Sequence, residues 1–205
     1  MTSDIAKNPI AAATRLFRQA GGTLRTRDAL SLGIHQRTLY ALRDTGVIER
    51  LGRGLYRLAD LPPLDNPDLV PIAHKIPNAV ICLISALAFH ELTTQIPHAV
   101  YIALKRGTEP PRLEHPPLRI FWFTGEAFTE GVEDHKIDGS VIHIYEQEKT
   151  LADCFKYRNK IGMDTVLEAL NLYREKKGFD PVKLMHYAQI CRVEKVIRPY
   201  LESLL

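Results

Sequence analysis

The chain has few cysteines and no long apolar run. Cys82, Cys154 and Cys191 are the only cysteines among 205 residues, too few and too scattered for a disulfide framework or a zinc site, and they favour a reducing compartment. No apolar run approaches the ~20 residues that a bilayer span requires, and residues 1–10 lack the apolar segment of a signal peptide. The sequence therefore predicts a cytoplasmic protein with no membrane association.

The motifs that mark common enzyme and metal-binding classes are also missing. The chain holds eight histidines, but none follows the H-x-x-x-H or H-E-x-x-H spacing that places two imidazoles on one metal ion. It contains no P-loop for phosphate and no G-x-S-x-G nucleophile motif. We therefore expect no bound metal, no cofactor and no catalytic residue.

One class of enzyme stays open on the residues alone. Nucleases of the restriction-endonuclease type hold Mg²⁺ with acidic residues beside a lysine on a sheet, and such side chains gather near the end of a predicted strand at Asp138, Glu146, Glu148 and Lys149. The usual acid-x-lysine pattern needs an acidic residue at position 147, where this chain has Gln147. A metal-dependent nuclease is therefore the weaker alternative to a function without catalysis.

The net charge of +3 hides an uneven distribution. Residues 1–60 carry ten basic and five acidic residues and so a net charge of +5, whereas the remaining 145 residues sum to −2. Nine of those ten basic residues are arginines, which form bidentate contacts with phosphate and guanine. This asymmetry predicts a first domain that binds nucleic acid and a different task for the rest of the chain.

Helix caps and glycines divide the first part of the chain into three short helices. The first is expected to begin at Asn8-Pro9 and to end at Gly21-Gly22. Thr26 is predicted to cap a second helix over 27–32, and a third covers about 36–45. Because a tight glycine turn separates the second helix from the third, this order predicts a helix-turn-helix.

A β-hairpin is predicted directly after the third helix. Residues 47–51 and 55–58 have the pattern of two strands around a Gly52-Arg53-Gly54 tip, which makes the domain a winged helix-turn-helix. At 100° per residue, Leu39 and Leu42 of the third helix point to the core and its polar residues point outward. The alternatives for this polar face are a solvated surface and a protein-interaction module. The predicted DNA-binding residues are Arg27, Gln36, Arg37, Thr38, Tyr40, Arg43 and Arg53.

A proline-rich stretch marks the predicted domain boundary. Residues 61–70 hold three prolines and cannot continue a helix or a central strand. We therefore predict a DNA-binding winged helix-turn-helix domain over residues 1–60, a linker over 61–70 and a C-terminal domain over 71–205.

The second domain alternates between strand and helix patterns. Strands are predicted over 99–104, 118–123 and 141–145, the last after an Asp138-Gly139 turn. A small sheet followed by a helical C-terminal half gives an α+β fold. Pro199 predicts a kink or a new helix start in the last segment. The other predicted helices cover about 85–92, 148–160 and 164–177, and one begins at Pro181.

Several stretches of this second domain resemble those of one known family. Residues 85–93 (SALAFHELT) and 148–158 (EKTLADCFKYR) look like its motifs, and residues 168–170 and 198–201 also fit. On these residues the chain resembles the AbiEi-type antitoxins of abortive-infection toxin–antitoxin systems over nearly its whole length. The run over 148–158 is the more specific part of this resemblance.

The resemblance implies a function in two parts. Such proteins pair an N-terminal domain, which represses the operon's own promoter at inverted repeats, with a C-terminal antitoxin domain. That second domain counteracts a cognate AbiEii-type nucleotidyltransferase toxin. A stable toxin–antitoxin complex is often not seen in these systems, so an indirect, type IV mode stands beside direct binding of the toxin. Operator DNA and this toxin are therefore the expected partners.

The more specific motif also contains the predicted antitoxin surface. On a helix, Leu151, Ala152 and Phe155 would face the core, and Lys149 and Asp153 are four residues apart and can pair. A helix packed on the sheet with a solvated basic face accounts for the same residues equally well. The surface residues predicted from the motif are Lys149, Asp153, Lys156, Tyr157, Arg158 and Lys160.

Overall fold

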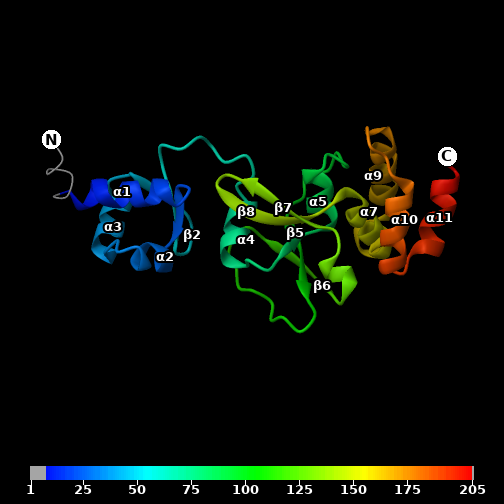
Figure 1. Ribbon diagram of the computed structural model, residues 1–205, viewed down its shortest axis with the longest axis horizontal. Coiled ribbons are helices and arrows are strands. Elements are labelled where there is room, and N and C mark those ends of the chain that lie inside the picture. Colours follow the sequence, from blue (N-terminus) through cyan, green and yellow to red (C-terminus); the bar gives the residue numbers. More distant parts are fainter. Residues whose placement is uncertain (1–7, 205) are drawn as a thin grey trace. The chain divides into compact units, whose positions relative to one another are not determined.

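The computed structural model of the chain describes residues 8–204 and shows an α+β fold, as predicted (Figure 1). The chain forms two compact units. Unit 1 comprises the residues up to Pro77 together with Lys136–Val141, and unit 2 comprises Asn78–His135 and the residues from Ile142 onward. The predicted linker over 61–70 lies within unit 1, and its role as a domain boundary stays a prediction. Within residues 8–204, no helix is long and apolar enough to cross a membrane.

Unit 1 contains the predicted winged helix-turn-helix. Its sheet is antiparallel with strand order β1-β3-β2. Phe17, Leu39 and Leu42 are fully buried and join the helices to this sheet in one apolar core. The elements follow one another as α1 (Pro9–Gln19), β1 (Thr23–Arg25), α2 (Thr26–Ser31), α3 (Gln36–Asp44), β2 (Ile48–Gly52) and β3 (Leu55–Leu58) (Figure 1).

The helix starts of unit 1 follow the predicted caps with one exception. The side chain of Asn8 accepts a hydrogen bond from the backbone N–H of Ile10 at 3.0 Å, so α1 begins as expected. Thr26 does not cap α2: it is the first residue of that helix, and Arg25 before it makes no capping side-chain hydrogen bond. The reason is that strand β1, which the sequence analysis missed, leads directly into α2.

Helix α4 (Leu69–Lys75) and the tip of a hairpin complete unit 1. The tip is the predicted Asp138-Gly139 turn, and both residues have the positive φ angles, 50° and 75°, of a two-residue hairpin turn. A Cβ atom at Gly139 would lie 2.7 Å from the carbonyl oxygen of Gly21. Glycine at position 139 therefore permits both the turn and this close approach.

Unit 2 is built around a mixed sheet of strand order β6-β5-β4-β8-β7. The predicted strand over 118–123 has those bounds in the structure, and the other two predicted strands are shifted by one residue at one or both ends. The sequence did not predict β4, because it has only two residues, or β7, because its residues are mostly polar and partly exposed. The strands are β4 (Val80–Ile81), β5 (Val100–Lys105), β6 (Leu118–Phe123), β7 (Val132–Ile137) and β8 (Ser140–Tyr145).

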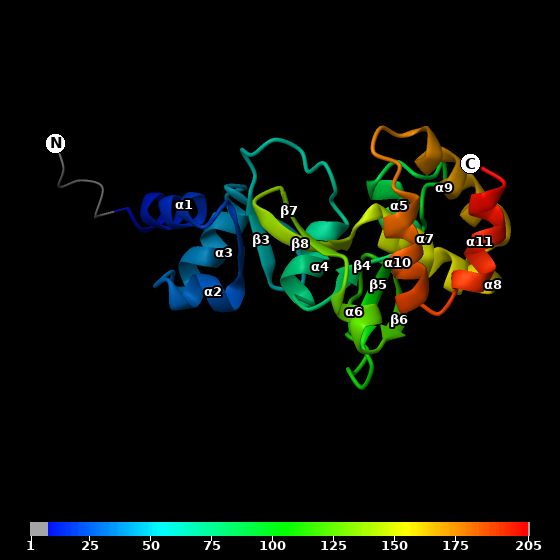
Figure 2. The same cartoon turned by 45° about the vertical axis from the view of Figure 1, so that its right-hand side comes forward.

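Seven helices accompany this sheet within the described residues, and α7, α9, α10 and α11 gather at one end of unit 2 (Figure 2). The predicted helix over 148–160 is interrupted at Tyr157, and α11 runs through Pro199 without a new start. Helix α7 packs against α5, α9 and α10. Their bounds are α5 (Leu83–Phe89), α6 (Glu126–Thr129), α7 (Gln147–Lys156), α8 (Arg158–Ile161), α9 (Met163–Glu175), α10 (Pro181–Ile190) and α11 (Glu194–Glu202).

Candidate nucleic-acid interface

Helix α3 has one buried face and one polar face. Leu39 and Leu42 have no exposed surface, whereas Gln36, Arg37 and Tyr40 are exposed. This separation follows from the helical period, because residues 39 and 42 lie on the side that packs against the core of unit 1. The helix can therefore present polar side chains to a partner without losing its own packing.

Contacts within α3 leave one of its arginines more available than the other. Arg43 donates to the Asp44 carboxylate at 2.7 and 2.8 Å, and this carboxylate raises the pKa of the Arg43 guanidinium. The guanidinium also lies 5.0 Å from the centre of the Tyr40 ring. The side chain of Arg37 has no ion pair with any residue that the structure describes. Arg37 is therefore the cation of α3 that is free to meet a phosphate or a base.

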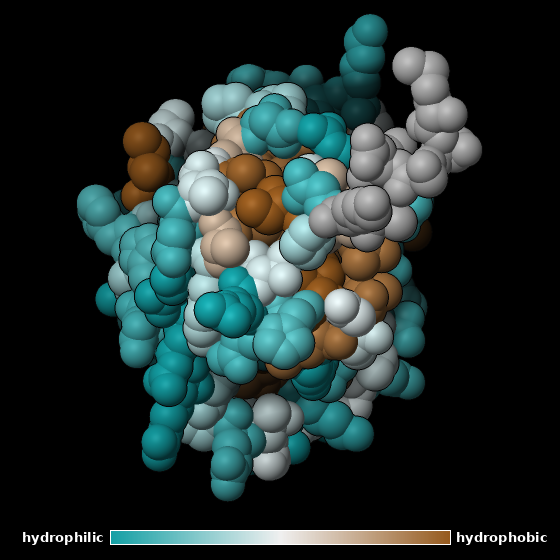
Figure 3. All heavy atoms as spheres, turned by 90° about the vertical axis from the view of Figure 1, so that its left-hand side faces the viewer, coloured by the Kyte–Doolittle hydropathy of each residue, from teal (hydrophilic) through white to brown (hydrophobic). Residues whose placement is uncertain are grey.

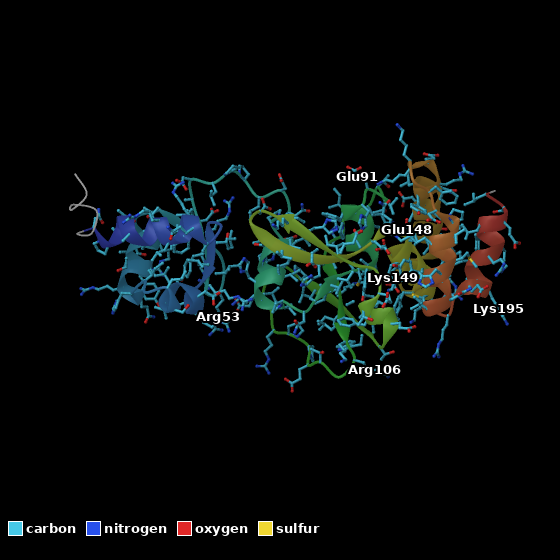
Figure 4. All side chains as sticks on the ribbon, in the orientation of Figure 1. Arg53, Glu91, Arg106, Glu148, Lys149 and Lys195 are labelled. Carbon is cyan, nitrogen blue, oxygen red and sulfur yellow. The ribbon has the colours of Figure 1, made fainter. Side chains whose placement is uncertain are left out.

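The wing places a second arginine beside the start of α2. Arg53 is exposed at the tip of the β2–β3 hairpin (Figure 4). The backbone N–H of Thr26 donates to the carbonyl of Gly54 at 2.9 Å, which holds the tip next to Arg27. Arg27 is exposed and lies 3.2 Å from the Asp28 carboxylate. Two predicted contact residues from separate segments are thus brought together.

Of the seven predicted DNA-binding residues, six are exposed and Thr38 is half-buried. Two other arginines of residues 1–60 form ion pairs within unit 1 and are not available to bind DNA. Arg57 is 5% exposed and pairs with Glu49 at 3.3 Å, and Arg18 pairs with Asp60. The positive charge available to a partner is therefore smaller than the composition of residues 1–60 implies.

Apolar side chains also reach the surface of unit 1. Leu30 and Leu32, at the end of α2, are 44% and 46% exposed. A space-filling view of this end of the chain shows hydrophobic residues among hydrophilic ones (Figure 3). Single exposed apolar residues of this kind are ordinary on a protein surface, so they do not favour the alternative of a protein-interaction module.

The six residues predicted as an antitoxin surface divide into a buried and an exposed group. Lys149 and Asp153 have no exposed surface, so the prediction that they belong to a surface is wrong. The physical reason is that α7 is covered on several sides, and every residue from Glu148 to Phe155 is buried. The predicted pairing of the two side chains is confirmed, with Lys149 Nζ 2.5 Å from Asp153 Oδ2.

The surroundings of this pair are those of a closed core. Lys149 Nζ lies 4.0 Å from the centre of the Tyr145 ring, and Cys191 Sγ donates to Asp153 Oδ1 at 3.2 Å. Burial raises the pKa of the Asp153 carboxyl, and the charge of Lys149 opposes that rise. Burial also raises the pKa of the Cys191 thiol to about 12. The pair and the thiol therefore have no access to a partner.

The acidic residues considered for a nuclease also have internal partners. Tyr173 donates to Glu148 at 2.5 Å, Tyr187 donates to Glu146, and Lys183 pairs with both carboxylates (Figure 4 labels Glu148). In the part of the chain that the structure describes, no group of three or more His, Cys, Asp or Glu side chains is arranged to hold a metal ion.

The remaining motif residues lie at the surface. Lys156 and Lys160 are exposed, and Tyr157 and Arg158 are half-buried. Sequence analysis missed a further cation in unit 2, Arg119 on β6, whose guanidinium lies 5.6 Å from the centre of the Tyr101 ring. The alternation along the predicted strand over 118–123 was a usable signal, because it places residues 119 and 121 on one face.

Comparison with known proteins bears on unit 1 in particular. Residues 12–59 match the sequence model of a family described as "Transcriptional regulator, AbiEi antitoxin". We refer to the winged helix of unit 1 as the AbiEi-type domain, because its sequence matches this family model. The match covers the helix-turn-helix and the wing of this AbiEi-type domain, while the motifs over 85–93 and 148–158 lie outside the matched residues. No match to the chain was found among curated proteins.

One solved structure shares the fold beyond the AbiEi-type domain. The crystal structure of the RV2827C protein from Mycobacterium tuberculosis superposes with a TM-score of 0.52 and covers 90% of this chain and 77% of that chain. The two sequences are 10% identical, so the likeness shows a common fold alone.

Proposed function

We propose that the chain is a DNA-binding antitoxin that represses its own toxin–antitoxin operon and counteracts a cognate nucleotidyltransferase toxin. The observation that carries the proposal is the exposed, arginine-bearing face of α3 and the wing in a domain that matches AbiEi antitoxin regulators. The protein acts by binding, without catalysis or a cofactor, and works in the cytoplasm.

The proposed interface assigns different tasks to α3 and to the wing. Helix α3 enters the major groove, where Gln36 and Arg37 of its first turn meet base edges and Arg37 pairs with guanine. Arg53 at the wing tip contacts phosphate or enters the minor groove beside Arg27. Thr38, Tyr40 and Arg43 complete this DNA-binding surface. Base contacts then select the operator, and phosphate contacts fix the orientation of the protein on it.

The operator in this proposal is a pair of inverted repeats upstream of the operon. A symmetric site of this kind is read by two copies of the chain, one on each half-site. Binding there blocks transcription of the toxin gene together with that of the antitoxin. The remaining motif residues, Lys156, Tyr157, Arg158 and Lys160, form the proposed antitoxin surface of unit 2.

The DNA-binding part is tested by titrating the full chain against DNA from upstream of its own operon. We expect Arg37→Ala to lose about 1–3 kcal/mol of binding free energy and to relax base preference. Arg53→Ala weakens all sequences alike and lowers the salt slope by about one. Arg174→Ala, at an exposed arginine of α9, is the matched control. Unchanged affinity in both Arg37→Ala and Arg53→Ala would show that the assigned face is wrong.

The antitoxin part is tested in cells that express the neighbouring reading frame. We expect growth arrest that this chain relieves, and that loss of Lys156 and Lys160 weakens the relief without changing operator binding. Co-purification of the two proteins indicates direct neutralisation, and relief without co-purification indicates the indirect mode. A neighbouring product that is no nucleotidyltransferase and no toxin would contradict the proposal.

A further inference from the structure

Aromatic rings and cations gather on one face of the β5–β6 sheet of unit 2. The rings of Tyr101 and Phe121 are stacked, with centroids 5.9 Å apart and planes inclined by 16°. Tyr157, just after α7, meets Phe121 edge-on at 4.9 Å. Strands β5 and β6 are parallel neighbours, which brings these rings from separate segments into one cluster. Tyr101 and Phe121 are buried, at 7% and 8% exposed, and Tyr157 is half-buried, whereas Arg119, Lys156 and Lys160 are exposed. We call the exposed cations, together with the rings beneath them, the cation–aromatic surface: Tyr101, Arg119, Phe121, Lys156, Tyr157 and Lys160.

Three cations of this surface lie over its rings and not beside carboxylates. The Arg119 guanidinium is 5.6 Å from the Tyr101 centroid, and Lys160 Nζ is 5.6 Å from the centroids of both Phe121 and Tyr157. Lys156 Nζ lies 6.0 Å from the Tyr157 centroid. Among the described residues, none of the three forms an ion pair. Their charge is therefore available to an anion, although residues 61–205 as a whole have a net charge of −2.

A cavity of about 420 Å³ adjoins this surface. Tyr101 and Arg119 belong to its lining, together with the polar side chains of Gln95 and His98 and the apolar side chain of Ile84. Among residues 8–204, no acidic side chain lines it. Its volume lies within the range of about 300–1,000 Å³ that is usual for small-ligand sites, and the Arg119 side chain supplies a cation in its lining.

We propose that the cation–aromatic surface binds single-stranded nucleic acid. Phosphates of the strand meet Lys156 and Lys160, and one base enters the cavity to stack on the exposed guanidinium of Arg119, which lies over the buried Tyr101 ring. Single strands are bound in this manner by basic grooves with aromatic or arginine stacking platforms. Duplex DNA would use the cations alone, since its bases are not free to stack, and an acidic peptide has no group that needs the rings.

Nucleic-acid binding deepens the proposed function, because it gives the antitoxin surface a ligand. It rests on the proposed function only in that both assign a role to Lys156, Tyr157 and Lys160. Binding of RNA is measurable without the toxin or the operator. Its failure is therefore distinguishable from failure of repression or of toxin relief.

The experiment measures fluorescence anisotropy of a labelled, mixed-sequence RNA of about 12 nucleotides, within the range of sites on single-strand-binding modules. The parent and all variants in this experiment are the full chain with Arg37→Ala and Arg53→Ala, so that the AbiEi-type domain contributes little to RNA binding. Arg119→Gln, Lys156→Gln and Lys160→Gln are then combined. The control combines Arg174→Gln, Lys177→Gln and Lys195→Gln, which removes the same charge from other exposed positions of unit 2 (Figure 4 labels Lys195).

We expect the first triple variant to bind the RNA at least tenfold more weakly and the control to bind within about twofold of the parent. An RNA with abasic positions and a duplex DNA of equal length should both bind more weakly than the intact single strand. Equal binding of the abasic RNA would refute the stacking role. Equal losses in the two triple variants, tighter binding of the duplex, or tighter binding of a poly-glutamate peptide would each overturn the proposal.

A milder change at Tyr157 separates the ring from the charges. Tyr157→Phe keeps the ring, and we expect it to keep RNA affinity. Tyr157→Leu removes the ring, and we expect a loss of at least threefold with the salt slope unchanged. Trp122 is the only tryptophan of the chain and lies on β6, so its fluorescence during urea unfolding verifies that each variant is folded. A folded Tyr157→Leu variant with parental affinity would contradict the assignment.

Discussion

The buried pair of Lys149 and Asp153 allows a quantitative prediction about the stability of unit 2. Both side chains have no exposed surface, and the ammonium and carboxylate groups are 2.5 Å apart. In Lys149→Met the carboxylate loses its only charged hydrogen-bond partner and keeps the Cys191 thiol, a weak donor. Removing one member of a buried pair costs about 3–5 kcal/mol, a large share of the ~5–15 kcal/mol that stabilises a typical protein.

The paired replacement gives the opposite expectation. Lys149→Met combined with Asp153→Leu removes both charges and keeps the apolar volume, so the desolvation of two ions is no longer required. We expect the free energy of unfolding of this double variant to lie within about 1 kcal/mol of the parent or above it. The coupling between the two sites is then on the order of 3 kcal/mol or more, at or above the top of the range of about 0.5–3 kcal/mol for contacting residues.

The pH dependence of the single variant supplies a second check. Burial already raises the pKa of Asp153, and Lys149 opposes this, so the loss of Lys149 raises it further. When the pKa of a carboxyl group is higher in the folded than in the unfolded state, the folded protein holds that proton more tightly. The contribution of that group to the free energy of unfolding is therefore greatest at low pH and decreases as pH rises from the pKa of the unfolded state to that of the folded state. The deficit of Lys149→Met relative to the parent should therefore grow between pH 4 and pH 7.

The assay is urea unfolding followed by the fluorescence of Trp122, which lies in unit 2. The parent, the two single variants and the double variant are compared at pH 7, with Lys177→Met as an exposed control. A single variant within about 1 kcal/mol of the parent, or a double variant as unstable as Lys149→Met, would refute the reasoning about this buried pair.

Three further predictions address the pH response, the packing and the absence of catalysis. Hydrogen bonds from the Thr94 hydroxyl and N–H lower the pKa of Glu168 from its ordinary 4.5, so Glu168→Gln should cost under about 1 kcal/mol of unfolding free energy at neutral pH. Urea titrations should show that this cost vanishes as pH falls through the pKa of Glu168 in the folded state. A cost that stays constant down to pH 2 would contradict this prediction. Gly131→Ala should destabilise unit 2 by about 1–3 kcal/mol. The added Cβ atom would lie 2.7 Å from Lys149 Cβ, and the φ angle of +72° at this position is one that alanine rarely adopts. A variant that unfolds at the same urea concentration as the parent would refute the close contact. Duplex DNA incubated with the chain and Mg²⁺ should stay intact, and turnover above that of Glu148→Ala would reinstate the nuclease alternative.

The elements of unit 1 could be predicted because their signals are local. The Asn8 side chain caps α1 through its own backbone neighbours, and Leu39 and Leu42 follow the period of α3. Strand β1 has three residues and no sequence pattern of its own. The strand forms because its backbone pairs with that of β3, with Thr23 opposite Arg57. This pairing joins residues far apart in the sequence, so no local pattern can predict it.

The predicted sites differ in how much of them depends on tertiary packing. The i, i+4 spacing predicted the pairing of Lys149 with Asp153, but charged residues on a helix usually indicate an exposed face. Their burial results from α5, α9 and α10 enclosing α7, and no local pattern records that enclosure. Arg119 was missed for a related reason, since its position beside Tyr101 follows from the pairing of β5 with β6.

The central claim is that the AbiEi-type domain reads a specific DNA sequence through α3 and the wing. The most direct measurement is the ratio of affinities of the full chain for its own upstream inverted repeats and for a scrambled duplex, at one salt concentration. We predict a ratio of at least about 10³, as is usual for specific DNA-binding proteins, which Arg37→Ala lowers at least tenfold and Arg174→Ala leaves unchanged. Equal affinity of the parent chain for both duplexes would contradict the claim.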